Sequence, residues 1–396
     1  MRLLHKPRER DGFARALVGV AVAALTLAGA ACGSTTTSST TSTSSATSTT
    51  RTTRTTSSNT TTTAPAPPGG VIPADFQPTS FTTVSLDEWW MLGTAQCLTG
   101  SGTCGAIVRT ADGGSSFVGI PSPPVSASDV TQLRFANALD GYAFDPELWE
   151  TINGGTSWGR VGTPGRVTEL EAADGEAYAL RCTTASCQSI ELLRSPVGSL
   201  KWQGVSTPVT LGYGAQFALS GPNLYVLSGK ERPLVLLYSA DKAASFSKRV
   251  NPCVATLGGN VTAAADGSPT LWAACPTGTE AGAWLSNNGG GTWRVAEPTE
   301  AGFPNSLGLA AASSSVALAW PGHQVSMELP AALDRTPDGG KSYSAVLSSS
   351  WHVSWAGFSD PARAYALVTG SGSTSPTDLV ESNDGGATWH QVVIKR

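Results

Sequence analysis

Charged side chains are scarce in this chain of 396 residues, since only 14% are Asp, Glu, Lys or Arg, and methionine occurs only three times. The 44 glycines and 25 prolines favour turns over long helices. Seven of the 25 basic residues lie in residues 1–70 with two of the 29 acidic ones, so the remainder carries nine more acidic than basic side chains. An acidic body without a basic stripe predicts no nucleic-acid partner. The composition therefore indicates a turn-rich, all-β protein.

Long apolar runs are also missing, except near the N-terminus. There, a basic flank precedes an uncharged run from Ala16 to Ala31, which is shorter than the roughly 20 residues that a membrane-spanning helix needs. This pattern is typical of a secretory signal peptide, which we expect over residues 1–31. The chain then continues to Cys32 through the sequence Leu-Ala-Gly-Ala-Ala-Cys.

This sequence resembles the lipobox of bacterial lipoproteins, in which the cysteine is acylated and the chain is cleaved just before it. Gly29 departs from the pattern, which usually has Leu, Val or Ile there. The resemblance implies a lipid anchor on Cys32 at the outer face of a bacterial membrane. The alternative is a secreted or cell-wall protein in which Cys32 is free.

Nearly every residue from 33 to 63 is Ser or Thr, and the sequence Ala-Pro-Ala-Pro-Pro-Gly-Gly follows at 64–70. Such a stretch has almost no apolar surface to bury. We therefore expect residues 32–75 to form a disordered tether and residues 76–396 to form the folded domain. Glycosylation of the tether is left open.

No C-x-x-C pair occurs, and only His323, His352 and His390 lie beyond the signal peptide, which argues against a zinc site. We expect no metal and no cofactor. Besides Cys32 there are six cysteines, an even number that is typical of disulfides in an exported chain. Of the 15 possible pairings, proximity in sequence favours Cys97 with Cys104, Cys182 with Cys187, and Cys253 with Cys275.

An eight-residue pattern dominates the rest of the chain and occurs seven times. It starts with Ser or Thr, usually has Asp or Asn third and Gly-Gly next, and ends on an aromatic residue. Successive copies lie 41 to 50 residues apart, and they end at Phe117, Trp158, Trp202, Phe246, Trp293, Tyr343 and Trp389. Such periods, with short strands between turns, are typical of propeller blades of four strands each. The sequence therefore predicts an all-β, seven-bladed β-propeller.

The residue types of this pattern suit a tight hairpin. The Asp or Asn oxygen accepts backbone N–H groups, the glycines supply positive φ, and the aromatic residue starts the next strand. The pattern resembles the Asp-box, or BNR repeat, of sialidases, sortilins and photosystem II assembly-factor-like propellers. That resemblance implies a structural role, away from any active site, for Asp112, Asn153, Asp241, Asn288, Asp338 and Asp384. The copy from Ser195 to Trp202 lacks the acid, and we expect it to form the loosest turn.

Residues that suit catalysis are few. Sialidases need three converging arginines, and the Arg-Ile-Pro motif of that family is absent. Other glycosidases need two carboxylates about 5–9.5 Å apart. The residues that we expect to face the channel are Arg134, Glu169, Glu171, Arg181 and Gln216. Carboxylates in loops opposite the repeat hairpins are further candidates: Asp145, Glu147, Glu231, Glu280, Glu328 and Asp334.

Two functions from different classes follow from these observations. The first, which we favour, is non-catalytic binding of a protein, peptide or glycan at the channel mouth of a monomeric, exported propeller. The alternative is a glycoside hydrolase, for which two carboxylates would have to converge in the channel. A purely structural envelope protein is a third possibility. An aromatic cluster of Trp149, Trp351 and Trp355 would either stack on sugar or pack in the core.

Overall fold

The computed structural model describes residues 69–97, 101–162, 165–228, 234–253, 259–276, 280–297, 303–304, 307–321, 333–347, 350–370 and 376–394. The predicted signal peptide, Cys32 and nearly all of the predicted tether lie outside these residues. Within them, all regular elements are β-strands, and none is a helix long and apolar enough to cross a membrane.

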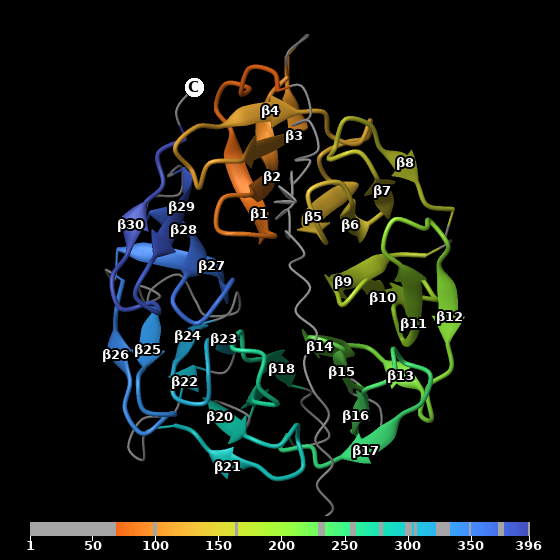
Figure 1. The fold of residues 1–396 in the computed structure, drawn as a ribbon, viewed down its shortest axis with the longest axis vertical. Coiled ribbons are helices and arrows are strands. Elements are labelled where there is room, and N and C mark those ends of the chain that lie inside the picture. The colour runs from red at the N-terminus through yellow and green to blue at the C-terminus, as the bar shows by residue number, and fades with distance from the viewer. Residues whose placement is uncertain are drawn as a thin grey trace, which may run out of the picture. The chain divides into compact units, whose positions relative to one another are not determined.

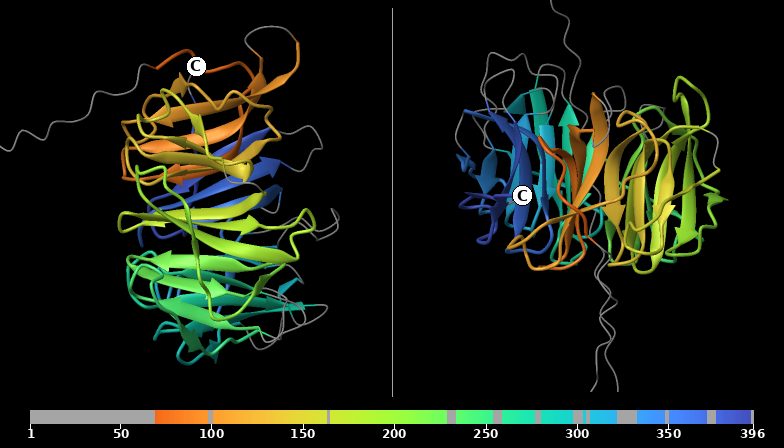
Figure 2. Two further views of the ribbon diagram at one scale, coloured as in Figure 1. Left: turned by 90° about the vertical axis from the view of Figure 1, so that its right-hand side faces the viewer. Right: turned by 90° about the horizontal axis from the view of Figure 1, so that it is seen from above.

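The strands form seven antiparallel sheets around a ring (Figure 1), which confirms the predicted seven-bladed β-propeller. Figure 2 views this ring from its side. Blade 1 contains β1 (Gln77–Thr83), β2 (Trp89–Gln96), β3 (Thr103–Thr110) and β4 (Val118–Ile120). Blade 2 contains β5 (Val130–Phe135), β6 (Gly141–Pro146), β7 (Trp149–Thr151) and β8 (Gly159–Arg160). Blade 3 contains β9 (Val167–Ala173), β10 (Glu176–Cys182), β11 (Ser189–Pro196) and β12 (Gln203–Val205), with β13 (Leu211–Gly212) also paired to β11.

The remaining four blades repeat this order from the channel outward. Blade 4 contains β14 (Gln216–Ser220), β15 (Asn223–Leu227), β16 (Leu236–Ser239) and β17 (Ser247–Arg249). Blade 5 contains β18 (Asn260–Ala263), β19 (Leu271–Pro276), β20 (Glu280–Ser286) and β21 (Arg294–Val295), with β22 (Phe303–Pro304) on β20. Blade 6 contains β23 (Leu307–Ala311), β24 (Ala317–Pro321), β25 (Asp334–Thr336) and β26 (Ser344–Ala345). Blade 7 contains β27 (Trp351–Phe358), β28 (Ala364–Gly370), β29 (Thr377–Ser382) and β30 (His390–Gln391).

Apolar side chains between neighbouring blades hold the ring together. Each of the seven core clusters combines residues from two adjacent blades. The second strand of every blade contributes a buried aromatic residue to this packing: Trp90, Tyr142, Tyr178, Tyr225, Trp272, Trp320 and Tyr365. Because a sheet buries both faces only between two neighbours, the closed ring leaves no blade with an uncovered face.

The ring closes without exchange of a strand, because each blade is built from strands that are consecutive in the sequence. Blades 7 and 1 instead meet through a shared cluster that includes Ile72, Phe76 and Tyr365. The backbone N–H of Thr377 also donates to Oε1 of Gln77, at 2.7 Å. Gly70, within the predicted tether, pairs with Gly119 on the outer strand of blade 1. The chain just before β1 is therefore part of the closure.

The seven repeats form the hairpins between the third and fourth strands, and we call them the repeat hairpins. In six of them the Asp or Asn oxygen accepts an N–H four residues on, at 2.8–3.0 Å. The hydroxyl of the first residue donates to the same oxygen and accepts the N–H of the fifth residue. These bonds hold the pKa of Asp241 and Asp338 at about 2.

The repeat hairpins are also hydrogen-bonded to the first-to-second-strand hairpins, which surround the channel. In blade 2, for example, the N–H of Gly154 donates to the carbonyl oxygen of Leu139, in the hairpin between the first and second strands, at 2.8 Å. Equivalent bonds occur in blades 1, 5, 6 and 7. The repeat hairpins therefore share one face of the ring with the first-to-second-strand hairpins that surround the channel. In the copy that lacks the acid, the hydroxyl of Ser195 accepts the N–H of Lys201 instead, at 3.2 Å.

All three predicted disulfides are confirmed. Cys97–Cys104 and Cys182–Cys187 connect the second and third strands of blades 1 and 3. Cys253–Cys275 joins the segment before β18 to the second strand of blade 5. All three lie toward the face opposite the repeat hairpins, where they constrain the loops of that face.

Candidate functional site

The central channel contains a cavity of about 520 Å³, and all seven innermost strands line it. The lining residues come from the C-terminal parts of these strands, such as Thr82 and Thr83 of β1 and Leu309 to Ala311 of β23. The first-to-second-strand hairpins follow directly after these strand ends. The channel cavity therefore lies toward the face that carries the repeat hairpins.

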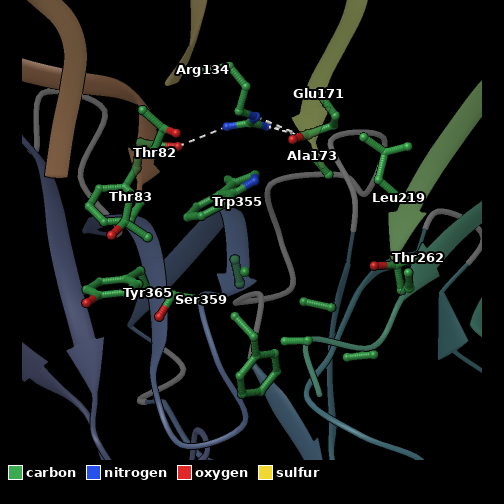
Figure 3. Close-up of a pocket in the computed structure, with 18 of the residues that line it drawn as sticks. Thr82, Thr83, Arg134, Glu171, Ala173, Leu219, Thr262, Trp355, Ser359 and Tyr365 are labelled. Atoms are coloured by element: carbon green, nitrogen blue, oxygen red, sulfur yellow. Dashed lines mark hydrogen bonds and ion pairs between the residues drawn. The ribbon is translucent and has the colours of Figure 1, made fainter. Parts of the chain in front are cut away.

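One ion pair joins the inner strands of two neighbouring blades at the wall of the channel cavity. Nε of Arg134 on β5 donates to Oε1 of Glu171 on β9 at 2.8 Å, and Nη2 of Arg134 lies 2.7 Å from the same oxygen (Figure 3). Nη1 of Arg134 donates to the carbonyl oxygens of Phe81 and Leu133. All three guanidinium nitrogens of Arg134 thus have partners, and Glu171 is the more exposed member of the pair (37% of its side chain).

The rest of the cavity wall is uncharged. Threonine and serine hydroxyls alternate with alanines, and aromatic side chains cover the side formed by blades 7 and 1. Figure 3 shows Trp355 of β27 next to the Arg134–Glu171 pair, and its ring centroid lies 5.9 Å from that of Phe81. Glu171 is the one carboxylate among the lining residues of this cavity. The wall therefore suits an uncharged ligand with apolar and hydrogen-bonding groups.

Backbone groups add to this surface. Each innermost strand has one partner strand within its sheet, so its other edge carries N–H and C=O groups outside the sheet. At β23 the neighbouring blade 5 covers part of this edge, because the N–H of Ala265 donates to the carbonyl oxygen of Ala311 at 3.0 Å. Side chains of the preceding blade bond to other groups of these edges. The hydroxyl of Ser80 accepts the N–H of Leu133, and the carboxylate of Glu169 accepts the N–H of Phe217 at 3.2 Å.

The sequence-predicted channel residues separate into three groups. Arg134 and Glu171 line the channel cavity, on facing strands of blades 2 and 3. Glu169 and Gln216 line a second cavity, at the opposite end of the inner strands of blades 3 and 4. Arg181 lies in neither, because it sits on the second strand of blade 3, where its guanidinium pairs with Glu191. The expectation that Arg181 faces the channel is therefore wrong.

Glu169 has the most perturbed acidity of this group. Burial between blades raises the pKa of its carboxyl to about 8, the N–H of Phe217 opposes the shift, and the charge of Glu171 adds to it. Glu169 is thus mostly protonated at neutral pH.

Two of the other carboxylate candidates are held in ion pairs. Asp145 pairs with Arg166 at 2.8 Å, and Glu147 pairs with Arg160 at 2.6 Å. Burial raises the pKa of Asp334. Glu231 and Glu328 lie outside the described residues. No group of three or more potential metal ligands occurs among the residues that the structure describes.

The predicted tryptophan cluster is not formed as expected. Trp149 packs between blades 1 and 2. Trp351 and Trp355 belong to blade 7, and Trp355 alone of the three lines the channel cavity. Sequence analysis also missed the threonines of β1 and β18 in the cavity wall. The only signal for them was the alternation of side chains along an inner strand.

A buried carboxylate that the sequence did not single out lies between blades 2 and 3. Glu150 of β7 is only 4% exposed, and Nε1 of Trp202 donates to its Oε1. Its Oε2 has no hydrogen-bond partner among the residues that the structure describes. Burial raises the pKa of Glu150 to about 7, and the charge of Asp140 adds to the shift.

No family model matches this sequence, and no curated protein is similar to it. Solved structures do match. A structure of YCF48 bound to D1 peptide is 16% identical over 79% of this chain and 95% of its own, with a TM-score of 0.54. YCF48 from Cyanidioschyzon merolae is 12% identical over 80% and 98% of the two chains, with a TM-score of 0.53. The β-propeller domain of the Trilobed protease from Pyrococcus furiosus is 9% identical over 80% and 95%, with a TM-score of 0.57. These similarities show the propeller fold alone.

Proposed function

We propose that this chain is an exported, lipid-anchored propeller that binds a peptide segment of a partner protein in its channel cavity and does not catalyse a reaction. The wall of that cavity carries the proposal. It combines an ion pair, hydroxyls, aromatic rings and the channel-side edges of the inner strands. An extended peptide matches such a wall, because its own N–H and C=O groups need partners and its side chains need pockets.

The structural neighbour YCF48 was solved with a bound peptide, which supports a peptide ligand for the same fold. The repeat hairpins support membership of the Asp-box propellers. Glycoside hydrolysis is less well supported, because it needs two carboxylates across a cleft. Glu171 is the one carboxylate that lines the channel cavity, and Arg134 already neutralises it.

Replacement of Trp355 by alanine tests where the peptide binds. We expect peptides selected from a displayed library on the full chain to bind the Trp355→Ala variant at least about tenfold more weakly, because aromatic anchors dominate such interfaces. Fluorescence anisotropy with a labelled peptide measures this loss. The matched control is Val295→Ala, since Val295 is 49% exposed on an outer strand of blade 5 and lies outside the channel lining. Unchanged affinity in a folded Trp355→Ala variant would place the ligand elsewhere.

A second variant tests the anchor. When the full chain is expressed in a bacterium with the lipoprotein pathway, we expect it to incorporate a labelled fatty acid and to partition into the detergent phase. The Cys32→Ser variant should do neither, because Cys32 is the one cysteine in the sequence that resembles a lipobox. Wild-type protein that stays unlabelled and in the aqueous phase would show that the chain is secreted without an anchor.

A further inference from the structure

A second cavity, of about 480 Å³, lies between blades 3 and 4. Its wall is formed where β9 and β14 begin, so it lies at the other end of the inner strands from the channel cavity. The residues that line it are Arg166, Thr168, Glu169, Cys187, Ile190, Tyr213, Gly214, Ala215 and Gln216. None of these residues lines the channel cavity, so the two sites are separate.

Tyr213 distinguishes this cavity from the rest of the surface. It is 52% exposed and is the one exposed large aromatic side chain among the described residues. Aromatic rings are normally buried because each Å² of apolar area removed from water contributes about 25 cal/mol. The exposed part of the Tyr213 ring is therefore apolar area at the wall of this cavity that a bound ligand would remove from water.

The position of Tyr213 is held by the fold. It follows β13, whose Leu211 is buried and whose Gly212 donates its N–H to the carbonyl oxygen of Ser228 in blade 4, at 2.9 Å. The N–H of Ala215 donates to the carbonyl oxygen of Gly212 at 3.0 Å and closes a β-turn. Gly214 has the positive φ of 76° that the third position of a type II turn requires. The turn thus presents the ring from a rigid base before any ligand arrives.

The polar groups around Tyr213 are mainly uncharged. The side-chain amide of Gln216 makes no hydrogen bond within the described part of the chain. Thr168 contributes a hydroxyl that donates to the carbonyl oxygen of Leu180 at 3.4 Å and keeps its acceptor sites for a ligand. Glu169, whose pKa burial raises to about 8, can both donate and accept at neutral pH. The single cation, Arg166, is held by Asp145 at 2.8 Å. Ile190 and the Cys182–Cys187 disulfide add an apolar wall.

We propose that this second cavity binds a neutral saccharide, with the ring of Tyr213 stacked on a pyranose face and with Gln216, Thr168 and Glu169 bonded to its hydroxyls. A pyranose has an apolar C–H face and an edge of hydroxyls that both donate and accept. An exposed, fixed aromatic ring beside amide, hydroxyl and protonated carboxyl groups matches both features. The volume lies within the range of about 300–1,000 Å³ that is usual for small-molecule sites. The paired state of Arg166 argues against a phosphate or carboxylate ligand.

The test uses the full chain on an array of neutral gluco-, manno-, galacto- and N-acetylglucosamine oligosaccharides. We expect saturable binding to at least one of them. For the best of these, Tyr213→Ala should weaken binding by at least about tenfold and Gln216→Ala by about fivefold, in line with the loss of a stacking or hydrogen-bonding contact. Tyr213→Phe keeps the ring and should stay within about threefold of the wild type.

Leu200→Ala is the control, because Leu200 is 55% exposed and lies on a repeat hairpin, outside this cavity. No binding to any oligosaccharide, or binding that Tyr213→Ala leaves unchanged, would overturn the proposal. Binding of the channel peptide by the Tyr213→Ala variant should equal that of the wild type. The peptide and saccharide sites can therefore fail separately.

Discussion

Replacing Trp90 by alanine should lower the free energy of unfolding by about 3–5 kcal/mol, the usual cost of removing a large buried aromatic side chain. Trp90 has no solvent exposure and stacks on Phe135 of the next blade, with centroids 4.0 Å apart and planes 6° apart. Arg109 lies over its other side, 5.5 Å from the ring centroid. Since no strand crosses the seams of the ring, such side-chain packing holds neighbouring blades together. Urea unfolding followed by far-UV circular dichroism measures the loss.

Two further variants show whether the stacked ring causes this effect. Trp90→Phe keeps the stack and removes the indole N–H, which is buried and has no hydrogen-bond partner in the described part of the chain. It should therefore lose less than about half as much stability. Leu86→Ala, in the same blade, should change stability by no more than about 0.5 kcal/mol, because Leu86 is 46% exposed. Equal losses in Trp90→Ala and Leu86→Ala would contradict the importance of this contact.

Replacement of Glu150 by glutamine should stabilise the protein increasingly as the pH rises. Burial raises the pKa of Glu150 from 4.5 to about 7 in the folded state. A carboxyl with a raised pKa contributes stability that is fully present below its unfolded pKa and is lost as the pH rises through its folded pKa. The glutamine amide in the Glu150→Gln variant would not titrate and would still offer an acceptor to Trp202.

The stability of the variant minus that of the wild type should therefore rise by about 2–3 kcal/mol between pH 4 and pH 8.5. Urea unfolding at both pH values measures this difference, and any constant cost of the buried amide cancels from it. Ile152→Ala is the control: Ile152 lies in the same blade, is 51% exposed and does not titrate, so its stability difference should not vary with pH. A difference for Glu150→Gln that does not vary with pH would show that the carboxyl is not shifted.

Much of the fold could be read from the sequence because the signals are local. The repeat hairpin needs only eight consecutive residues, as the bonds of Asp338 to Thr336 and Ser342 show. Each copy therefore carries its own turn, and seven copies at regular spacing determine seven blades. The disulfides were predictable for the same reason, because two of the three pairs close loops within one blade connection.

The candidate sites depended on the tertiary structure, because they bring together residues from distant strands. The sequence alone does not distinguish Arg134 from Arg181. Only the ring places Arg134 on an inner strand facing Glu171 and Arg181 on a second strand facing Glu191. The raised pKa of Glu169 likewise comes from packing against a neighbouring blade and has no sequence signal.

The sequence by itself thus determined the number of blades, the form of their hairpins and the disulfide pairs, since these depend on interactions within a few residues or one repeat. The tertiary structure decided how the ring closes, at which end of the channel the cavity lies, and that Tyr213 is exposed beside Glu169 and Gln216. These features arise where blades meet. The physical reason is that inter-blade contacts join residues about one or more repeats apart, and composition and spacing carry no information about which of them touch.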